Sequence, residues 1–194
     1  MKKSIILLIL FNALYFTSCN KSTVTNVNDT NNSSTITVPV VANQLKFNGN
    51  GFLHNGVFPK LYTCDSLGFS PGLQWSNAPS STKYYAITMY TIPPTGDKHV
   101  YIVLYNIPST TTSIPDNSKN IGIFGINTVD GKTTYTPPCS QGPGPKVYVL
   151  TLYALNAEPS ISVPNTQVTM DILSAGMKNK IVDSAVMSVT YTRP

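Results

Sequence analysis

From residue 45 to its end, the chain alternates short runs of β-branched and aromatic residues with clusters of proline, glycine and asparagine. Such runs are typical of β-strands, and the clusters between them are typical of turns. The clearest predicted strands cover residues 84–90, 100–106, 146–155 and 184–192. Residues 147–153 are apolar at both odd and even positions, which predicts a central strand covered on both faces.

One segment near the carboxyl end has helical rather than strand periodicity. Its apolar residues recur at spacings of three to five, at Val168, Ile172, Leu173 and Met177. Either Thr166 or Thr169 is expected to cap the start of this helix, because a threonine hydroxyl can accept from a free N–H of the first turn. The pattern as a whole predicts a mostly β, sandwich-like domain over residues 45–194 with a C-terminal helix.

The first 18 residues have the pattern of a signal peptide. Lys2 and Lys3 precede a largely apolar stretch, residues 5–16, that is shorter than the roughly 20 residues of a membrane span. The sequence FTSC at 16–19 then resembles the lipobox of bacterial lipoproteins, which are cut before a cysteine that receives acyl chains. We therefore expect a lipoprotein signal peptide at 1–18 and lipidation of Cys19. The alternative is an ordinary secretory signal with an incidental cysteine.

Residues 19–44 are expected to form a flexible tether between this lipid anchor and the domain. Threonine, asparagine and serine dominate the segment, and it has too few large apolar side chains to offset the entropy of ordering it. The expected location is therefore the bacterial cell envelope, with the protein attached to a membrane at the outer membrane or the periplasmic face.

Charge excludes one large class of partner. Only 11% of the residues are charged, and the formal net charge is +5. Loss of Lys2 and Lys3 with the signal peptide lowers this charge by two, to +3. The lysines are scattered singly and Arg193 is the only arginine, so the sequence has no basic stripe. Nucleic acid is therefore not an expected partner.

Several short motifs occur in the order found in one protein family. They are GVFP at 56–59, YTCD at 62–65, SPGLQW at 70–75, YNIP at 105–108, GIN at 125–127, YTPPC at 135–139 and YVLTLYAL at 148–155. Together they resemble the phosphatidylethanolamine-binding protein family, in its bacterial Raf-kinase-inhibitor-like branch. The resemblance covers roughly residues 52–193. It implies an antiparallel β-sandwich in which a smaller sheet packs on a larger one, with few peripheral helical turns.

The resemblance also implies a small open pocket for phosphate- or carboxylate-type anions. Family members build it from an Asp-Pro-Asp-x-Pro loop and two histidines, and this chain differs at each of those charged positions. The acidic loop falls on residues 90–94, which begin with Tyr90 and contain no aspartate. The histidine positions hold Tyr101 and Lys146, whereas Tyr148 and Pro138 match the family.

These residues still predict a site for a small anionic or polar ligand. The ammonium group of Lys146 and the phenols of Tyr90, Tyr101 and Tyr148 can all donate hydrogen bonds to an anion. His99 is a candidate replacement for a missing histidine, with a solvated surface residue as the alternative. The pocket would lack a carboxylate to accept from an ethanolamine group. A pocket that has lost its ligand is the other interpretation.

Cys64 and Cys139 lie in two of the family-like loops and are the cysteines that remain if Cys19 is lipidated. We expect a disulfide between them, since disulfides are allowed outside the cytoplasm and this one would close a loop of about 75 residues. Two buried free thiols are the alternative, since the sequence does not give the distance between the cysteines.

No motif points to catalysis, a metal or a cofactor. The sequence has no Gly-x-Ser-x-Gly, and its two histidines lack the neighbouring cysteine or carboxylate cluster of a zinc site. We therefore expect a non-catalytic binding protein. The alternative is a protein-interaction or inhibitor module with a protein partner, as in other family members, and a polysaccharide-binding adhesin is a third reading.

Overall fold

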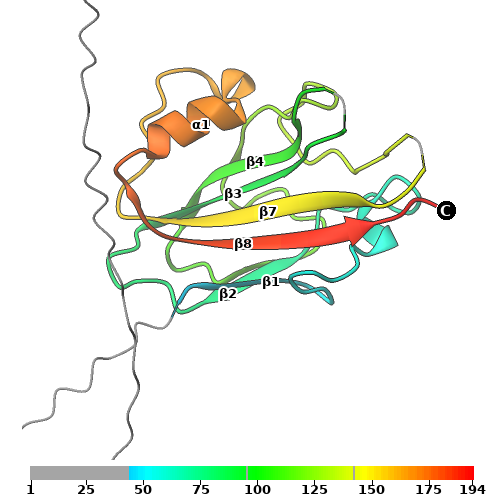
Figure 1. Cartoon of the computed structure of the whole chain (residues 1–194). Coiled ribbons are helices and arrows are strands. Elements are labelled where there is room, and N and C mark those ends of the chain that lie inside the picture. The colour runs from blue at the N-terminus through cyan, green and yellow to red at the C-terminus, as the bar shows by residue number, and fades with distance from the viewer. Residues whose placement is uncertain (1–43, 95, 142) are drawn as a thin grey trace, which may run out of the picture. The chain divides into compact units, whose positions relative to one another are not determined.

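The computed structural model describes residues 44–94, 96–141 and 143–194 (Figure 1). The expected signal peptide at 1–18, the lipidation site Cys19 and the expected tether up to residue 43 lie outside the described residues. Within the described part of the chain, no helix is long and apolar enough to cross a membrane.

Two antiparallel sheets form the domain, which is mostly β with one α-helix among the described residues. In the larger sheet the strand order is β6 (Ile123–Phe124), β4 (His99–Pro108), β3 (Tyr84–Thr91), β7 (Lys146–Leu155) and β8 (Ile181–Tyr191). In the smaller sheet the order is β1 (Lys46–Gly49), β2 (Leu73–Ser76) and β5 (Ser113–Ile114). Figure 1 shows the smaller sheet on one side of the larger sheet and helix α1 (Met170–Met177) on the other.

The four predicted strands are all present in the larger sheet, with ends shifted by no more than three residues. The prediction of a central strand over residues 147–153 is confirmed, because β7 lies between β3 and β8 in the sheet. The prediction that both faces are covered needs correction, because Val147 at the start of β7 is 52% exposed. Helix α1 packs near Leu155, at the other end of that strand.

Helix α1 begins where the capping pattern predicts. Thr169 is its N-cap, and the Thr169 hydroxyl accepts a hydrogen bond of 3.2 Å from the backbone N–H of Ile172. The apolar face of the helix buries Leu173 and Met177 against Ala86 and other residues on the outer face of the larger sheet. The helix therefore stabilises this sheet from the side opposite the smaller sheet.

The main core lies between the two sheets and is rich in aromatic rings. Phe58 is fully buried, and its ring centroid lies 5.4 Å from that of Phe52, 5.6 Å from that of Tyr62 and 5.8 Å from that of Tyr148. Such distances are typical of favourable aromatic pairs. This packing joins the GVFP segment and the turn η1 (Lys60–Tyr62) to strand β7, so the amino-terminal part of the domain is fixed against the larger sheet.

Candidate functional site

A hollow of about 520 Å³ opens at the end of the larger sheet where β3 ends and β4 and β7 begin. The antiparallel pairing of β3 with both of its neighbours brings these strand ends together, with Thr91 opposite His99. Loops complete the walls of the hollow. We call it the Lys146 pocket, and its lining residues are Thr91, Pro93, Pro94, His99, Tyr101, Val129, Cys139, Ser140, Gln141, Pro143 and Lys146.

Three of the six predicted ligand-binding residues line this pocket: Lys146, Tyr101 and His99. Lys146 is half-buried, and its Nζ donates a 3.0 Å hydrogen bond to the carbonyl oxygen of Pro143. Within the described residues Lys146 forms no ion pair, and no aspartate or glutamate lines the pocket. Its ammonium group therefore keeps two N–H bonds and its full charge available for a ligand.

A β-bulge aims Tyr101 into the pocket. Tyr90 pairs with Val100 and Met89 pairs with Ile102, so Tyr101 is an extra residue on β4. Because a bulge changes the alternation of side chains, both Tyr101 and Ile102 face the interior. Burial, helped by the nearby Tyr148 hydroxyl, raises the pKa of Tyr101 above its ordinary value. Tyr101 therefore remains a neutral hydrogen-bond donor at physiological pH.

Tyr148 lies beneath the pocket rather than in its lining. Its side chain is fully buried, and its ring centroid is 5.6 Å from that of Tyr101. Burial, with a smaller contribution from Tyr191, raises the pKa of Tyr148 to about 12. Its hydroxyl has no hydrogen-bond partner among the described residues. A buried polar group without a partner is uncommon, and the ring that carries this one packs against the ring of Tyr101, which lines the pocket.

The remaining two predicted residues do not line the pocket. Pro138 is buried next to Cys139, and its carbonyl oxygen accepts a 3.1 Å hydrogen bond from the backbone N–H of Cys64. Tyr90 packs on the outer face of the larger sheet, where the ammonium of Lys98 lies 4.4 Å from its ring centroid. The next residue, Thr91, lines the pocket instead because neighbouring residues of a strand point to opposite faces.

One wall of the pocket is tied to distant parts of the chain. Cys139 forms a disulfide with Cys64, and their Cα atoms are 5.2 Å apart. The carboxylate of Asp65 accepts a 2.8 Å hydrogen bond from the Tyr191 hydroxyl and a 2.9 Å hydrogen bond from Nε of Arg193. The bond from Tyr191, together with Arg193, lowers the pKa of Asp65 despite some desolvation. These contacts fasten the wall to strand β8.

A second wall is positioned by one buried amide. Asn127 is 2% exposed, and its Oδ1 accepts hydrogen bonds from the backbone N–H groups of Val129 (2.8 Å) and Asp130 (3.0 Å). Its Nδ2 lies 2.8 Å from Oδ1 of Asp130. Burial alone would raise the pKa of Asp130, but hydrogen bonds from Asn127, Lys132 and Thr136 outweigh it and lower the pKa to about 2. This network holds Val129 at the pocket.

Sequence reasoning did not identify the residues that form most of the walls. Val129, Ser140, Gln141 and Pro143 come from loops, and they carry no charge or motif that would mark them as site residues. One sequence signal could have pointed to these loops: prolines are concentrated at 93–94 and 143–145, beside the expected pocket positions.

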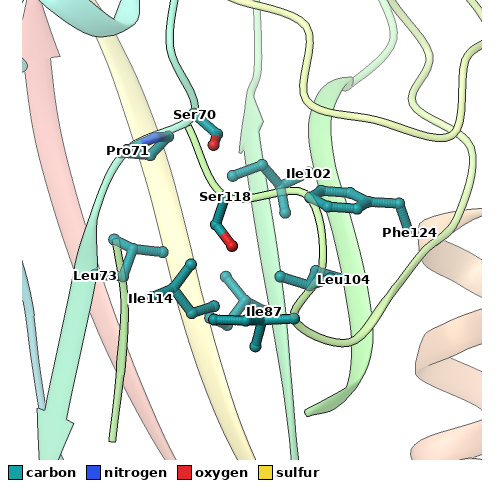
Figure 2. Close-up of a pocket in the computed structure, with 10 residues that line it drawn as sticks. Ser70, Pro71, Leu73, Ile87, Ile102, Leu104, Ile114, Ser118 and Phe124 are labelled. Atoms are coloured by element: carbon teal, nitrogen blue, oxygen red, sulfur yellow. The ribbon is translucent and has the colours of Figure 1, made fainter. Parts of the chain in front are cut away.

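A second cavity lies between the two sheets and has a different character (Figure 2). Figure 2 shows aliphatic side chains from both sheets, among them Leu73, Ile87 and Ile114, with the hydroxyl of Ser118 between them. We call it the inter-sheet crevice. Its volume is about 10 Å³, which is room for about one water molecule, so it is packed core rather than a ligand site.

No metal site accompanies the Lys146 pocket. In residues 44–94, 96–141 and 143–194 no three histidine, cysteine, aspartate or glutamate side chains cluster in a way that would hold a metal ion. The polar groups of the pocket are an ammonium, an imidazole, a phenol, the hydroxyls of Thr91 and Ser140 and the amide of Gln141, and the rest of its lining is apolar.

Comparisons with known proteins agree with this architecture. Residues 48–192 match the family model for phosphatidylethanolamine-binding protein. A UPF0098 protein of Chlamydia pneumoniae is 28% identical over 148 residues, which cover 73% of this chain and 95% of that protein.

Two solved structures have the same fold. A phosphatidylethanolamine-binding protein homologue, CT736 of Chlamydia trachomatis, superimposes with a TM-score of 0.71 at 24% identity and covers 78% of this chain and 99% of its own. The E. coli protein YbcL, described as a member of the mammalian family, gives a TM-score of 0.69 at 22% identity and covers 78% of this chain and 100% of its own. The family match and the fold together show that this chain belongs to the phosphatidylethanolamine-binding protein family.

Proposed function

We propose that this protein is a non-catalytic lipoprotein of the bacterial cell envelope that binds a small anionic or polar ligand in the Lys146 pocket. One observation carries the proposal: the unpaired ammonium of Lys146 lines the same open hollow as Tyr101 and His99, with no carboxylate among the lining residues. A cation without an acidic protein partner favours a ligand that brings a negative charge.

A binding role also agrees with the state of the reactive groups at the pocket. Cys139 is held in a disulfide and cannot act as a thiolate nucleophile. The hydroxyl of Thr91 donates to the carbonyl oxygen of Val147 at 2.6 Å, and none of the hydrogen bonds of the described residues joins His99 to a hydroxyl. The nucleophile and base pair of covalent catalysis is therefore not a feature of this arrangement.

Titration of the purified full chain with inorganic phosphate and with acetate tests the pocket. We expect binding in the millimolar range, detected as chemical-shift changes in NMR spectra. Lys146→Ala should weaken binding roughly tenfold, because a hydrogen bond to a charged group contributes about 1.5–3 kcal/mol. Lys83→Ala is the matched control, since Lys83 is exposed at the opposite end of β3. Absence of binding, or equal binding by the Lys146 variant, would contradict the proposal.

The anchor has a separate test. If Cys19 carries acyl chains, the protein should fractionate with membranes in its native bacterium, and Cys19→Ser should release it into the soluble fraction. A change at Thr17, such as Thr17→Ser, keeps a small residue before the cysteine and is the control. Unchanged membrane association of the Cys19 variant would refute lipidation at this residue.

An interaction or inhibitor module is the second candidate function. It is favoured by exposed apolar side chains on the segment before β2, with Leu53 60%, Val57 74% and Leu67 66% exposed. Exposed apolar groups of this kind are typical of partner contacts. The two functions separate in one measurement: capture of an envelope protein should survive Lys146→Ala if docking is primary, and Val57→Asp should abolish it.

A further inference from the structure

The walls of the Lys146 pocket are mostly apolar. Pro93 and Pro94 come from the loop between β3 and β4, Val129 from the loop after β6, and Pro143 from the loop before β7. The buried ring of Tyr101 lies at the floor. A volume of about 520 Å³ is within the range of pockets that enclose small organic ligands, and such pockets combine apolar walls with a few placed polar groups.

The charged side chains in and around the pocket also limit which ligand charges it can match. Lys146 is the one lysine among the described lining residues, and no aspartate or glutamate is among them. Asp97, in the loop between β3 and β4, is exposed to solvent, and two other acidic side chains of the surrounding loops have their own cations. Asp130 pairs with Lys132 at 3.0 Å, and Asp65 pairs with Arg193 at 2.9 Å. A second negative charge on a ligand would meet no second lysine or arginine among the lining residues that the structure describes. A positive charge on the ligand would meet no lining carboxylate.

From this combination we propose that the Lys146 pocket selects singly charged carboxylates that carry a short hydrocarbon chain. The carboxylate accepts from the Lys146 ammonium and the Tyr101 hydroxyl, and the chain packs against the proline rings and Val129. This inference rests on the proposed function, because it names the ligand class of the same pocket. It also gives a reason for the missing aspartates: the ligand has no ammonium group for them to accept from.

The apolar walls set the size of the expected effect. Burial of a methylene group favours binding by about 0.8 kcal/mol when it is complete, so partial burial should give roughly a threefold gain in affinity per methylene. Hexanoate has four more methylenes than acetate, and we therefore expect it to bind roughly 80-fold more tightly.

Two further ligands isolate the charge requirement. The compound 6-aminohexanoate has the same chain but ends in an ammonium group, which would have to leave water without a carboxylate to meet it. Hexanamide has the chain without the negative charge. Both should bind at least tenfold more weakly than hexanoate. The ammonium end of 6-aminohexanoate does not suit the apolar walls, and hexanamide cannot form the ion pair with Lys146.

Calorimetric and NMR titrations of the full chain with acetate, hexanoate, 6-aminohexanoate, hexanamide and phosphate test the inference. Val129→Asn should lower the affinity for hexanoate about threefold or more relative to the affinity for acetate. Val186→Asn is the matched control, because Val186 is an exposed valine on β8. Lys146→Met keeps the aliphatic part of the side chain and should lose hexanoate binding.

The outcomes separate this inference from the proposed function. If acetate or phosphate binds as tightly as hexanoate and binding still needs Lys146, the chain-length inference is overturned and the anion pocket stands. If 6-aminohexanoate or hexanamide binds as tightly as hexanoate, the requirement for a single negative charge is overturned. If none of these ligands binds, both the inference and the pocket function fail.

Discussion

Tyr101 and Ile102 are neighbours on β4, but they line two different regions of the molecule. Ile102 lines the inter-sheet crevice, where aliphatic side chains from both sheets leave room for about 10 Å³ (Figure 2). Tyr101 lines the Lys146 pocket, which is open over about 520 Å³. No described residue of the smaller sheet lines the pocket. The sandwich therefore closes where two sheets face each other and stays open where loops take the place of the second sheet.

The inter-sheet crevice and the Lys146 pocket are held together by different kinds of interaction. The crevice depends on burial of apolar area, which acts without specific partners. The pocket walls depend on specific connections instead: a disulfide, the ion pair of Asp65 with Arg193, and the hydrogen bonds of Asn127. Changes to the two regions should consequently differ in size and in their dependence on redox conditions and pH.

The largest expected effect is removal of the disulfide in the pocket wall. The double variant Cys64→Ser with Cys139→Ser should lower the free energy of unfolding by about 4 kcal/mol. The disulfide joins residues 75 apart, so its removal gives the unfolded chain much more conformational freedom. Chemical denaturation of the full chain measures this, and the reduced wild-type protein should match the variant. A loss below about 1 kcal/mol would show that the connection is unimportant for stability.

The second largest effect on stability should come from truncating a side chain that lines the inter-sheet crevice. Ile102→Ala removes a buried side chain between the sheets and should lower the free energy of unfolding by about 3 kcal/mol. The exposed Val147, on the outer face of the same sheet, provides the comparison, and Val147→Ala should change stability by less than about 0.5 kcal/mol. Equal effects of the two substitutions would break the contrast between packed and open regions.

The Asn127 network predicts a dependence on pH. The folded pKa of Asp130 is lowered to about 2 from its ordinary value of 3.8, so its contribution to stability is present above that ordinary value. The contribution is lost as the pH falls from about 4 through about 2. It should be on the order of 1 kcal/mol, since the partly exposed carboxylate is screened by water.

Asp130→Asn tests this dependence by unfolding experiments between pH 2 and pH 7. The variant should be less stable than wild type at pH 7 and nearly equal to it at the acidic end. A constant difference across this range would mean that the Asp130 charge does not hold the wall that carries Val129.

The smallest effect is expected beneath the pocket floor. Tyr148→Phe removes a buried hydroxyl that has no partner among the described residues, so the free energy of unfolding should stay within about 1 kcal/mol of wild type or rise. Thermal and chemical unfolding measure it. A larger loss would reveal a buried water or another partner of the hydroxyl and would extend the polar region of the pocket below Tyr101.

Much of the fold could be predicted because it depends on local patterns. The four long strands follow from runs of β-branched and aromatic residues, and the helix follows from apolar spacing and a threonine cap. The ordered motifs also led to Lys146 and Tyr101, and the spacing from Tyr101 led to His99; the three line one pocket in the structure. The sequence could not assign Tyr90 to a face, because residues 84–90 are apolar or aromatic at positions of both parities.

The sequence by itself determined the mostly β fold, the helix, the low charge and the loss of the family's charged pocket residues. Only the tertiary structure decided which side chains share the pocket. An extra residue in β4 directs Tyr101 inward, and a buried asparagine positions Val129 from a loop. The physical reason is that bulges and loop hydrogen bonds depend on partners far along the chain, whereas strand and helix patterns depend on near neighbours.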